Sequence, residues 1–268
     1  MTRFIIFVDG SNLTGSLKYL NLRVKEYGTF LNYILKQAID SWSSSVMGGG
    51  YGQARLIRVL WYAVGSIDIW KLDEPESKNQ LLDWFKSDKD LQRKYLALAG
   101  SNLSSTEASP IELASEAWRL CFSEISTWYN QKKKYVDGLR DFHFGVSSGT
   151  DFIDIIACGH LKVDILNKNL YEKGIDTSLA VDMVTLADIY DVALIISGDA
   201  DSIPSIQRIK HKGKQAGVIE FIKGYPPEKR GRQSSSKLKA AADFIVPIYE
   251  SELQQKGIAT KRNSDSFT

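Results

Sequence analysis

Val192-Ala-Leu-Ile-Ile-Ser-Gly-Asp-Ala-Asp-Ser-Ile-Pro204 contains a short apolar run, 193–196, that predicts a β-strand buried on both faces. The strand ends at a Ser-Gly turn, and two carboxylates, Asp199 and Asp201, follow directly. A helix is predicted to begin at about Pro204. Because open α/β sheets bind ligands at the carboxyl ends of their strands, this stretch predicts both an α/β fold and the place of its site.

The start of the chain repeats this pattern. Residues 4–8 form a second apolar run, which is followed by Asp9, Gly10, Ser11 and Asn12. The other predicted elements are strands at 56–64, 142–148, 216–222 and 243–248, and helices at 14–22, 29–44 and from 176 to about 190. Strands that alternate with helices predict a three-layer α/β/α sandwich with a mostly parallel, doubly wound sheet.

The segment 66–140 interrupts this alternation, because its periodicity is helical and its composition shifts towards Lys, Asp, Ser and Trp. Its longest predicted helix covers 110–134. We therefore expect a discontinuous α/β domain at 1–65 and 141–250, a helical insertion at 66–140, and a polar C-terminal tail at 251–268 that is frayed from Lys256.

Composition limits the class of protein. The chain has 268 residues, of which 43% are hydrophobic and 25% charged, so it is predicted to be globular. A net charge of +2 means that any contact with nucleic acid depends on local basic patches. Cys121 and Cys158 match no metal-binding spacing. With no secretory leader and no apolar run that could span a bilayer, we expect a cytoplasmic protein.

A third carboxylate is predicted to face the sheet. Asp182 lies one helical turn from both Leu179 and Leu186, so its side chain points where those leucines point. A charge on a buried stripe is costly unless a partner neutralises it, and a divalent cation shared with Asp9 and Asp199 is such a partner. Oxygen ligands without His or Cys favour Mg²⁺ or Mn²⁺. Acids around such an ion can hydrolyse a phosphodiester through a metal-activated water, with Asp201 assisting.

Each of these residues also has a simpler interpretation. Asp9 and Asp199 stand beside glycines and could open turns, and Asp201 could cap a helix. Asp176 is interpreted as a helix cap that supports the site. Asn12 could orient the substrate phosphate or cap the first helix. Ser11 and Ser197 are candidate hydrogen-bond donors to phosphate, with the same local alternative.

The motifs resemble a known family. Phe7-Val-Asp-Gly-Ser-Asn12, Lys173-Gly-Ile-Asp-Thr-Ser-Leu-Ala-Val-Asp-Met183 and Ser197-Gly-Asp-Ala-Asp201 look like the NYN family, the LabA-like branch of the PIN-like nucleases. The resemblance covers the first strand and about 170–248, and it implies a PIN-like sandwich and metal-dependent RNA cleavage. It places the family's acids on Asp9, Asp182, Asp199 and Asp201, with Asn12 and Asp176 as companions.

A basic loop follows the predicted strand at 216–222. Its residues predicted to contact RNA are Lys223, Tyr225, Lys229, Arg230 and Arg232. The cations can hold phosphates close to the acids, and the tyrosine can stack on a base. The alternative is a solvated loop without a ligand. The six tryptophans are expected to pack in the core rather than to stack on bases.

Other functions fit less well. A phosphatase of the haloacid dehalogenase type needs an acid where this chain has Ser11. A dinucleotide-binding enzyme needs a Gly-x-Gly-x-x-Gly turn after the first strand, which residues 10–15 do not provide. We therefore expect a metal-dependent ribonuclease with RNA as its partner, without excluding a homo-oligomer. The alternative is a non-catalytic module that binds RNA or a protein partner through the insertion.

Overall fold

The computed structural model describes residues 1–45, 53–102, 109–227 and 236–262. Its strands are β1 (Thr2–Asp9), β2 (Leu22–Val24), β3 (Ala54–Ile67), β4 (Ile153–Asp164), β5 (Asn169–Lys173), β6 (Val192–Ile196), β7 (Gln215–Ile222), β8 (Phe244–Tyr249) and β9 (Ala259–Lys261). Its α-helices are α1 (Gly10–Tyr19), α2 (Tyr27–Ser43), α3 (Pro75–Ser87), α4 (Lys89–Asn102), α5 (Pro110–Ser148), α6 (Ile175–Thr185), α7 (Ile203–His211), α8 (Ser236–Ala241) and α9 (Glu250–Gln255). Two short 3₁₀ turns, η1 (Leu186–Ile189) and η2 (Ala200–Ser202), flank β6.

The chain divides into two compact units. The first comprises 1–65, 140–159 and 173–268, and the second comprises 66–139 and 160–172. Four elements, β3, β4, β5 and α5, have residues in both units. No helix in the described ranges is both long and apolar enough to cross a membrane.

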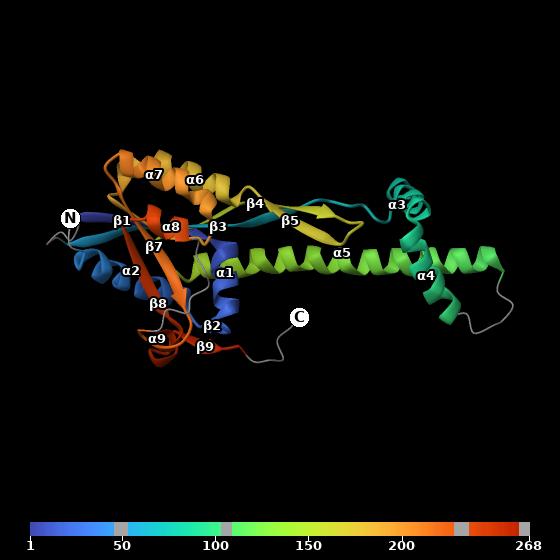
Figure 1. The fold of residues 1–268 in the computed structure, drawn as a ribbon, viewed down its shortest axis with the longest axis horizontal. Coiled ribbons are helices and arrows are strands. Elements are labelled where there is room, and N and C mark those ends of the chain that lie inside the picture. Colours follow the sequence, from blue (N-terminus) through green and yellow to red (C-terminus); the bar gives the residue numbers. More distant parts are fainter. Residues whose placement is uncertain (46–52, 103–108, 228–235, 263–268) are drawn as a thin grey trace. The chain divides into compact units, whose positions relative to one another are not determined.

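A seven-stranded sheet has the order β5-β4-β3-β1-β6-β7-β8, and β3, β1, β6, β7 and β8 pair in parallel. In the first unit, α6 and α7 cover one face of this sheet and α1 and α2 cover the other (Figure 1). The predicted α/β sandwich is therefore confirmed. The parallel direction brings the carboxyl ends of β1, β3 and β6 to one edge, called here the carboxyl edge.

The two apolar runs that suggested this fold are its central strands. Residues 4–8 of β1 and 192–195 of β6 are fully buried, because helices cover both faces of the sheet. Alternate side chains of β1, Phe4, Ile6 and Val8, pack into the core on the α1 and α2 side.

An ion pair closes the opposite, amino end of these strands. The Arg3 guanidinium donates to both carboxylate oxygens of Asp191, at 2.8 and 3.1 Å, and the backbone N–H of Arg3 donates to the same carboxylate at 2.8 Å. These contacts hold the pKa of Asp191 at about 2. Both side chains keep more than a third of their surface exposed, so screening by solvent keeps the pair's contribution to stability small.

This pair predicts a pH dependence of stability. Because the folded pKa of Asp191 lies below its ordinary value of 3.8, the contribution is complete above about pH 4 and is lost as the pH falls towards 2. We expect Arg3→Gln to lower the free energy of unfolding at pH 7 more than at pH 2.5. Urea unfolding of both proteins at the two pH values measures the difference. An equal loss at both values would show that the carboxylate does not contribute.

The second unit has its own core. Helices α3, α4 and α5 pack with the end of β4 through buried residues such as Phe85, Tyr95, Ala117 and Ile125. Four tryptophans pack against this cluster, and Trp42 and Trp61 are buried in the first unit. The expected core role of the tryptophans is therefore confirmed.

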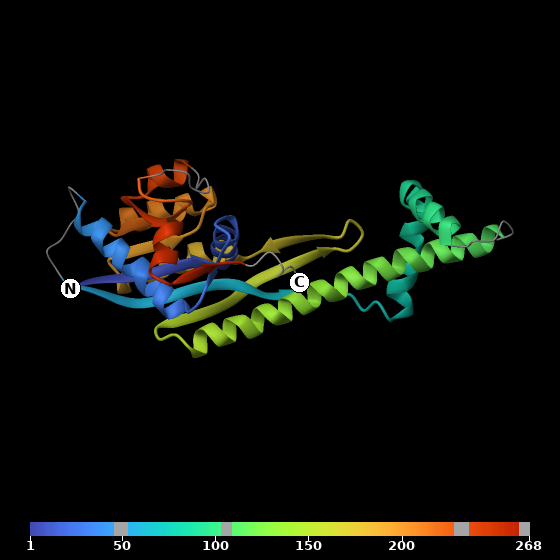
Figure 2. The ribbon, with the colours of Figure 1, turned by 90° about the horizontal axis from the view of Figure 1, so that it is seen from below.

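Two predictions of secondary structure are wrong. Residues 142–148, expected to be a strand, are the last two turns of α5, which runs uninterrupted from Pro110 (Figure 2). Residues 251–261, expected to be a polar tail, are ordered: α9 buries Leu253, and β9 pairs antiparallel with β2. The first of these errors came from the spacing of aromatic residues, and the second from the polar composition of the segment.

Candidate functional site

Asp9 is the most enclosed of the predicted acids, with 2% of its surface exposed. It ends β1 and caps α1: one carboxylate oxygen accepts the backbone N–H of Asn12 at 2.9 Å, and the other accepts the side-chain amide of Asn12. The cap of the first helix is therefore Asp9 rather than Asn12. The amide oxygen of Asn12 accepts the N–H of Gly198 at 3.2 Å, which joins the ends of β1 and β6.

Asp182 lies on α6 at the border of its buried stripe, which consists of Ile175, Leu179 and Met183. Its carboxylate accepts a hydrogen bond of 2.9 Å from the hydroxyl of Tyr62 on β3. Tyr62 is the register partner of Asp9 in the pairing of β1 with β3. Burial, followed by the bond to Asp182, raises the pKa of Tyr62 far above its ordinary value, so this phenol stays a donor. The half-buried carboxylate is thus stabilised by a hydrogen bond from a tyrosine that the sequence pattern did not indicate.

We expect Tyr62→Phe to lower the free energy of unfolding by about 1 kcal/mol, because Asp182 loses a hydrogen bond but keeps access to water. Chemical denaturation measures the change. Tyr225→Phe is the matched control, because this phenol is 61% exposed and its loss is expected to have no effect. Equal stability of Tyr62→Phe and the unchanged protein would contradict a structural role for the bond.

Asp199 and Asp201 are exposed just beyond the end of β6. Asp199 caps the turn η2, and its carboxylate accepts the backbone N–H of Asp201 at 3.2 Å. The hydroxyl of the buried Ser197 accepts the N–H of Asp199, also at 3.2 Å. Ser197 therefore takes part in the turn, and its role as a hydrogen-bond donor to phosphate stays a prediction. The two carboxylates remain accessible from solvent.

The sequence suggested that Asp176 caps α6, but in the structure it does not. The N-cap is Gly174, whose φ of +100° suits glycine, and a Cβ at this position would lie 3.0 Å from the carbonyl oxygen of Cys158. Asp176 follows in the first turn of the helix and is exposed. There it borders the same groove as Asp201, which brings together two acids that the sequence analysis had given different roles.

The predicted three-aspartate metal centre is not assembled. Among the described residues, no three His, Cys, Asp or Glu side chains form a group that could hold a metal ion. The physical reason is local: Asp9 is bonded to Asn12, Asp182 to Tyr62, and Asp199 to the backbone of its own turn. Mg²⁺, however, is commonly held by one or two carboxylates together with water and substrate phosphates. The exposed oxygens of Asp199 and Asp201 fit that requirement.

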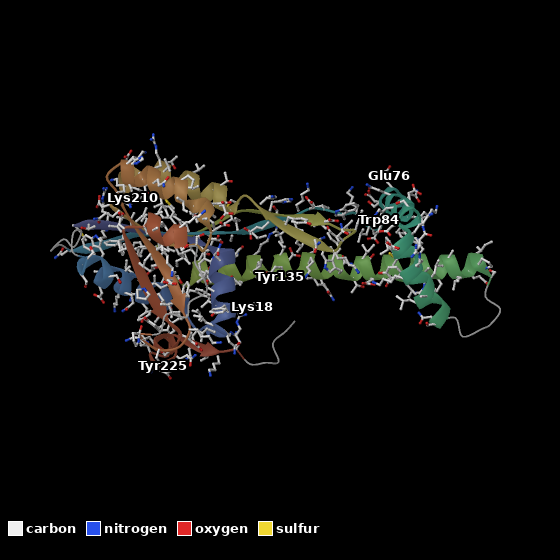
Figure 3. The ribbon with its side chains drawn as sticks, in the orientation of Figure 1. Lys18, Glu76, Trp84, Tyr135, Lys210 and Tyr225 are labelled. Carbon is white, nitrogen blue, oxygen red and sulfur yellow. The ribbon has the colours of Figure 1, made fainter. Side chains whose placement is uncertain are left out.

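The predicted RNA-binding loop is described only in part. Lys223 is exposed, with its ammonium 5.9 Å from the centre of the Tyr19 ring, and Tyr225 is exposed beyond it. Tyr225 and Lys210 of α7 lie at opposite ends of β7, well apart in Figure 3. Ser11 is exposed on the first turn of α1. Three residues of the prediction lie outside the described ranges: Lys229, Arg230 and Arg232.

His160 belongs to the second unit. Its Nδ1 is 2.8 Å from the hydroxyl of Ser66, and its Nε2 is 2.8 Å from a carboxylate oxygen of Asp68. The other oxygen of Asp68 accepts the N–H of Val163 at 2.8 Å. These bonds fasten the end of β3 to β4, so we assign this histidine a structural role.

Comparison with known proteins agrees with the motifs. The model of the NYN domain matches residues 130–250. A solved structure of a protein of unknown function from Vibrio parahaemolyticus is similar at 15% identity, covering 92% of this chain and 93% of that chain, with a TM-score of 0.42. No curated protein matches.

The matched residues include Asp176, Asp182, Asp199 and Asp201, and the fold around them is the mostly parallel sheet expected for the nuclease-like, PIN-like class. The part of the chain that carries these acids, residues 130–250, is therefore similar to the NYN domain.

Proposed function

We propose that this protein is a cytoplasmic ribonuclease that hydrolyses RNA phosphodiester bonds with Mg²⁺ or Mn²⁺ held at the carboxyl edge by Asp199 and Asp201. The observation that carries the proposal is the position of these two exposed acids, directly after a central parallel strand within the region similar to the NYN domain. Bound there, the ion supplies positive charge to the phosphate and to the leaving oxygen.

The remaining residues of the edge hold this arrangement. Asn12 fixes the end of β6 against that of β1, so the turn with Asp199 and Asp201 starts from a rigid base. The N-termini of α1, α6 and α7 come directly after Asp9, Gly174 and Ser202. The partial positive charge of a helix N-terminus favours carboxylates and phosphates. Tyr62 keeps Asp182 directed towards β3.

Incubation with labelled single-stranded and structured RNAs, and with DNAs of the same sequences, tests the proposal. We expect RNA cleavage with Mg²⁺ or Mn²⁺ and none with EDTA. The chemistry of the product ends and the lengths of the products distinguish endonucleolytic from exonucleolytic cleavage. Metal-independent cleavage, or no cleavage of any substrate, would contradict the proposal.

Metal binding is expected to depend on RNA, because two carboxylates leave several positions of the ion to water and phosphate. We expect Mn²⁺ and a hydrolysis-resistant phosphorothioate RNA together to raise the melting temperature by more than the sum of their separate effects. Differential scanning fluorimetry measures the three shifts. Additive shifts would show that the ion and the RNA bind independently.

One observation favours the alternative of a non-catalytic module that binds RNA or a protein partner. Both oxygens of Asp9 are hydrogen-bonded to Asn12, as in a purely structural helix cap. Such a module binds its partner without cleavage, and its affinity does not depend on Mn²⁺. The incubation and scanning experiments therefore separate the two functions.

A further inference from the structure

A groove of about 570 Å³ lies between α6 and α7 in the first unit. We call it the α6–α7 groove. It is lined from α6 by Asp176, Thr177, Ala180, Val181, Val184 and Thr185, and from the other side by Asp201, Pro204, Ser205 and Arg208. The proposed function assigns no role to most of these residues.

One end of the groove is continuous with the proposed metal-holding acids. Asp201 lines the groove, and its backbone N–H bonds the carboxylate of Asp199. Asp176, from the first turn of α6, lines the same end. A ligand that enters here reaches the acids of the carboxyl edge without leaving the groove.

The walls between the ends are apolar and open to water. Ala180, Val184 and Pro204 contribute hydrocarbon, and Val181 keeps 53% of its surface exposed. When a ligand covers an apolar side chain that is this exposed, the removal of its surface from water contributes favourably to the free energy of binding. The wall can therefore receive a ribose or the face of a base.

The far end is cationic. Arg208 is exposed on α7, seven residues after Asp201. At the rise of an α-helix, seven residues span about 10 Å along the helix axis. Within the described ranges, no acidic side chain forms an ion pair with Arg208. Lys212 extends this end, with its ammonium donating to the carbonyl oxygen of Val184 at 3.1 Å.

We infer that the α6–α7 groove binds the single-stranded RNA next to the bond that is cut, with Arg208 on a flanking phosphate and Val181 against a ribose or base. The inference rests on the proposed function, because it assigns the acidic end of the groove to the scissile phosphate. An ion bound by Asp199 and Asp201 would offset the repulsion between that phosphate and the acids. A single-stranded RNA carries phosphates at intervals, with the apolar faces of ribose and base between them. This spacing matches the order of acidic, apolar and cationic residues along the groove.

Fluorescence anisotropy with a labelled single-stranded RNA in Mn²⁺ tests the groove separately from cleavage, when a phosphorothioate backbone slows hydrolysis below the time of the measurement. We expect Arg208→Ala to weaken binding by about 5- to 20-fold and to reduce the slope of log Kd against log salt concentration by about 0.7, the value for one phosphate contact on a single strand. Val181→Asp is expected to weaken binding at least as much, because it places a negative charge on the wall. Arg208→Lys is expected to recover part of the affinity.

Arg23→Ala is the matched control, because Arg23 is an exposed cation on β2, away from the groove lining. It is expected to leave the affinity and the slope unchanged. If Arg208→Ala and Val181→Asp both bind RNA as the unchanged protein does, the inference is wrong. If the protein without substitutions still cleaves RNA in that case, the proposed function stands although the inference about the groove does not. Weakened binding without any cleavage would instead support the groove and contradict the ribonuclease. Tighter binding of the matching DNA would assign the groove to a different nucleic acid and overturn the inference.

Discussion

Asp199→Asn is expected to lower the rate of metal-dependent RNA cleavage by at least about 100-fold. The substitution removes the negative charge that holds the ion but keeps an oxygen at the same position, and losses of 10²- to 10³-fold are typical when one charge-stabilising group is removed from an active site. Folding should not change, because asparagine also caps helices and turns and can still accept the N–H of Asp201. Single-turnover cleavage in Mn²⁺ measures the rate, and circular dichroism verifies the fold.

Asp188→Asn provides the comparison. Asp188 is also exposed, but it lies in η1, before β6 and therefore at the opposite edge of the sheet from Asp199. The rate of RNA cleavage by Asp188→Asn is expected to stay within about twofold of that of the unchanged protein, since a surface charge at this distance is largely screened by salt. Similar rates for the two variants would mean that Asp199 does not contribute to the chemistry. A large loss in both would point to a general effect of surface charge on RNA binding.

The central part of the fold could be predicted because burial on both faces leaves a clear pattern in the sequence. Strands β1 and β6 are covered by helices on each side, so their residues are apolar without interruption and each run stops where the strand stops. The positions of Asp9 and Asp199 at the carboxyl edge followed from those boundaries.

The end of α5 shows where such patterns fail. Phe142, Phe144 and Val146 alternate as the residues of a strand do, but Phe144 is 75% exposed, whereas His143 and Val146 are buried. Their spacing of three residues is the period of a helix face. The helix that began at Pro110 simply continues, and the alternation of aromatics is incidental.

The contacts of the acids could not be predicted, because they depend on how separate elements align. The bond from Tyr62 to Asp182 requires the register of β3 against β1 and the rotation of α6 about its axis. The bond from the N–H of Gly198 to the amide oxygen of Asn12 joins residues 186 positions apart in the chain. A pattern in one segment carries no information on either, so the positions of Asp9 and Asp199 at the edge could be predicted but the hydrogen-bond partners of the acids could not.

Gly10→Ala is expected to lower the free energy of unfolding by about 2–3 kcal/mol. A Cβ at Gly10 would lie 2.6 Å from Nε1 of Trp61 and 2.7 Å from the backbone carbonyl oxygen of Tyr62, closer than such atoms approach. Trp61 is buried and Tyr62 is fixed in β3, so neither can move without disturbing the core, and overpacking of this kind typically costs about 1–3 kcal/mol. Urea denaturation measures the loss.

The same substitution should also reduce cleavage, because α1 must shift to relieve the contact and α1 carries Asn12, which joins β1 to β6. Gly145→Ala separates this effect from the general effect of adding a methyl group. Gly145 lies within α5 with nothing within 4 Å of the added Cβ, so alanine there is expected to stabilise the protein by about 0.5–1 kcal/mol. If Gly10→Ala were as stable and as active as Gly145→Ala, α1 would be free to move away from β3, and the carboxyl edge would not be the rigid base on which Asp199 and Asp201 are proposed to act.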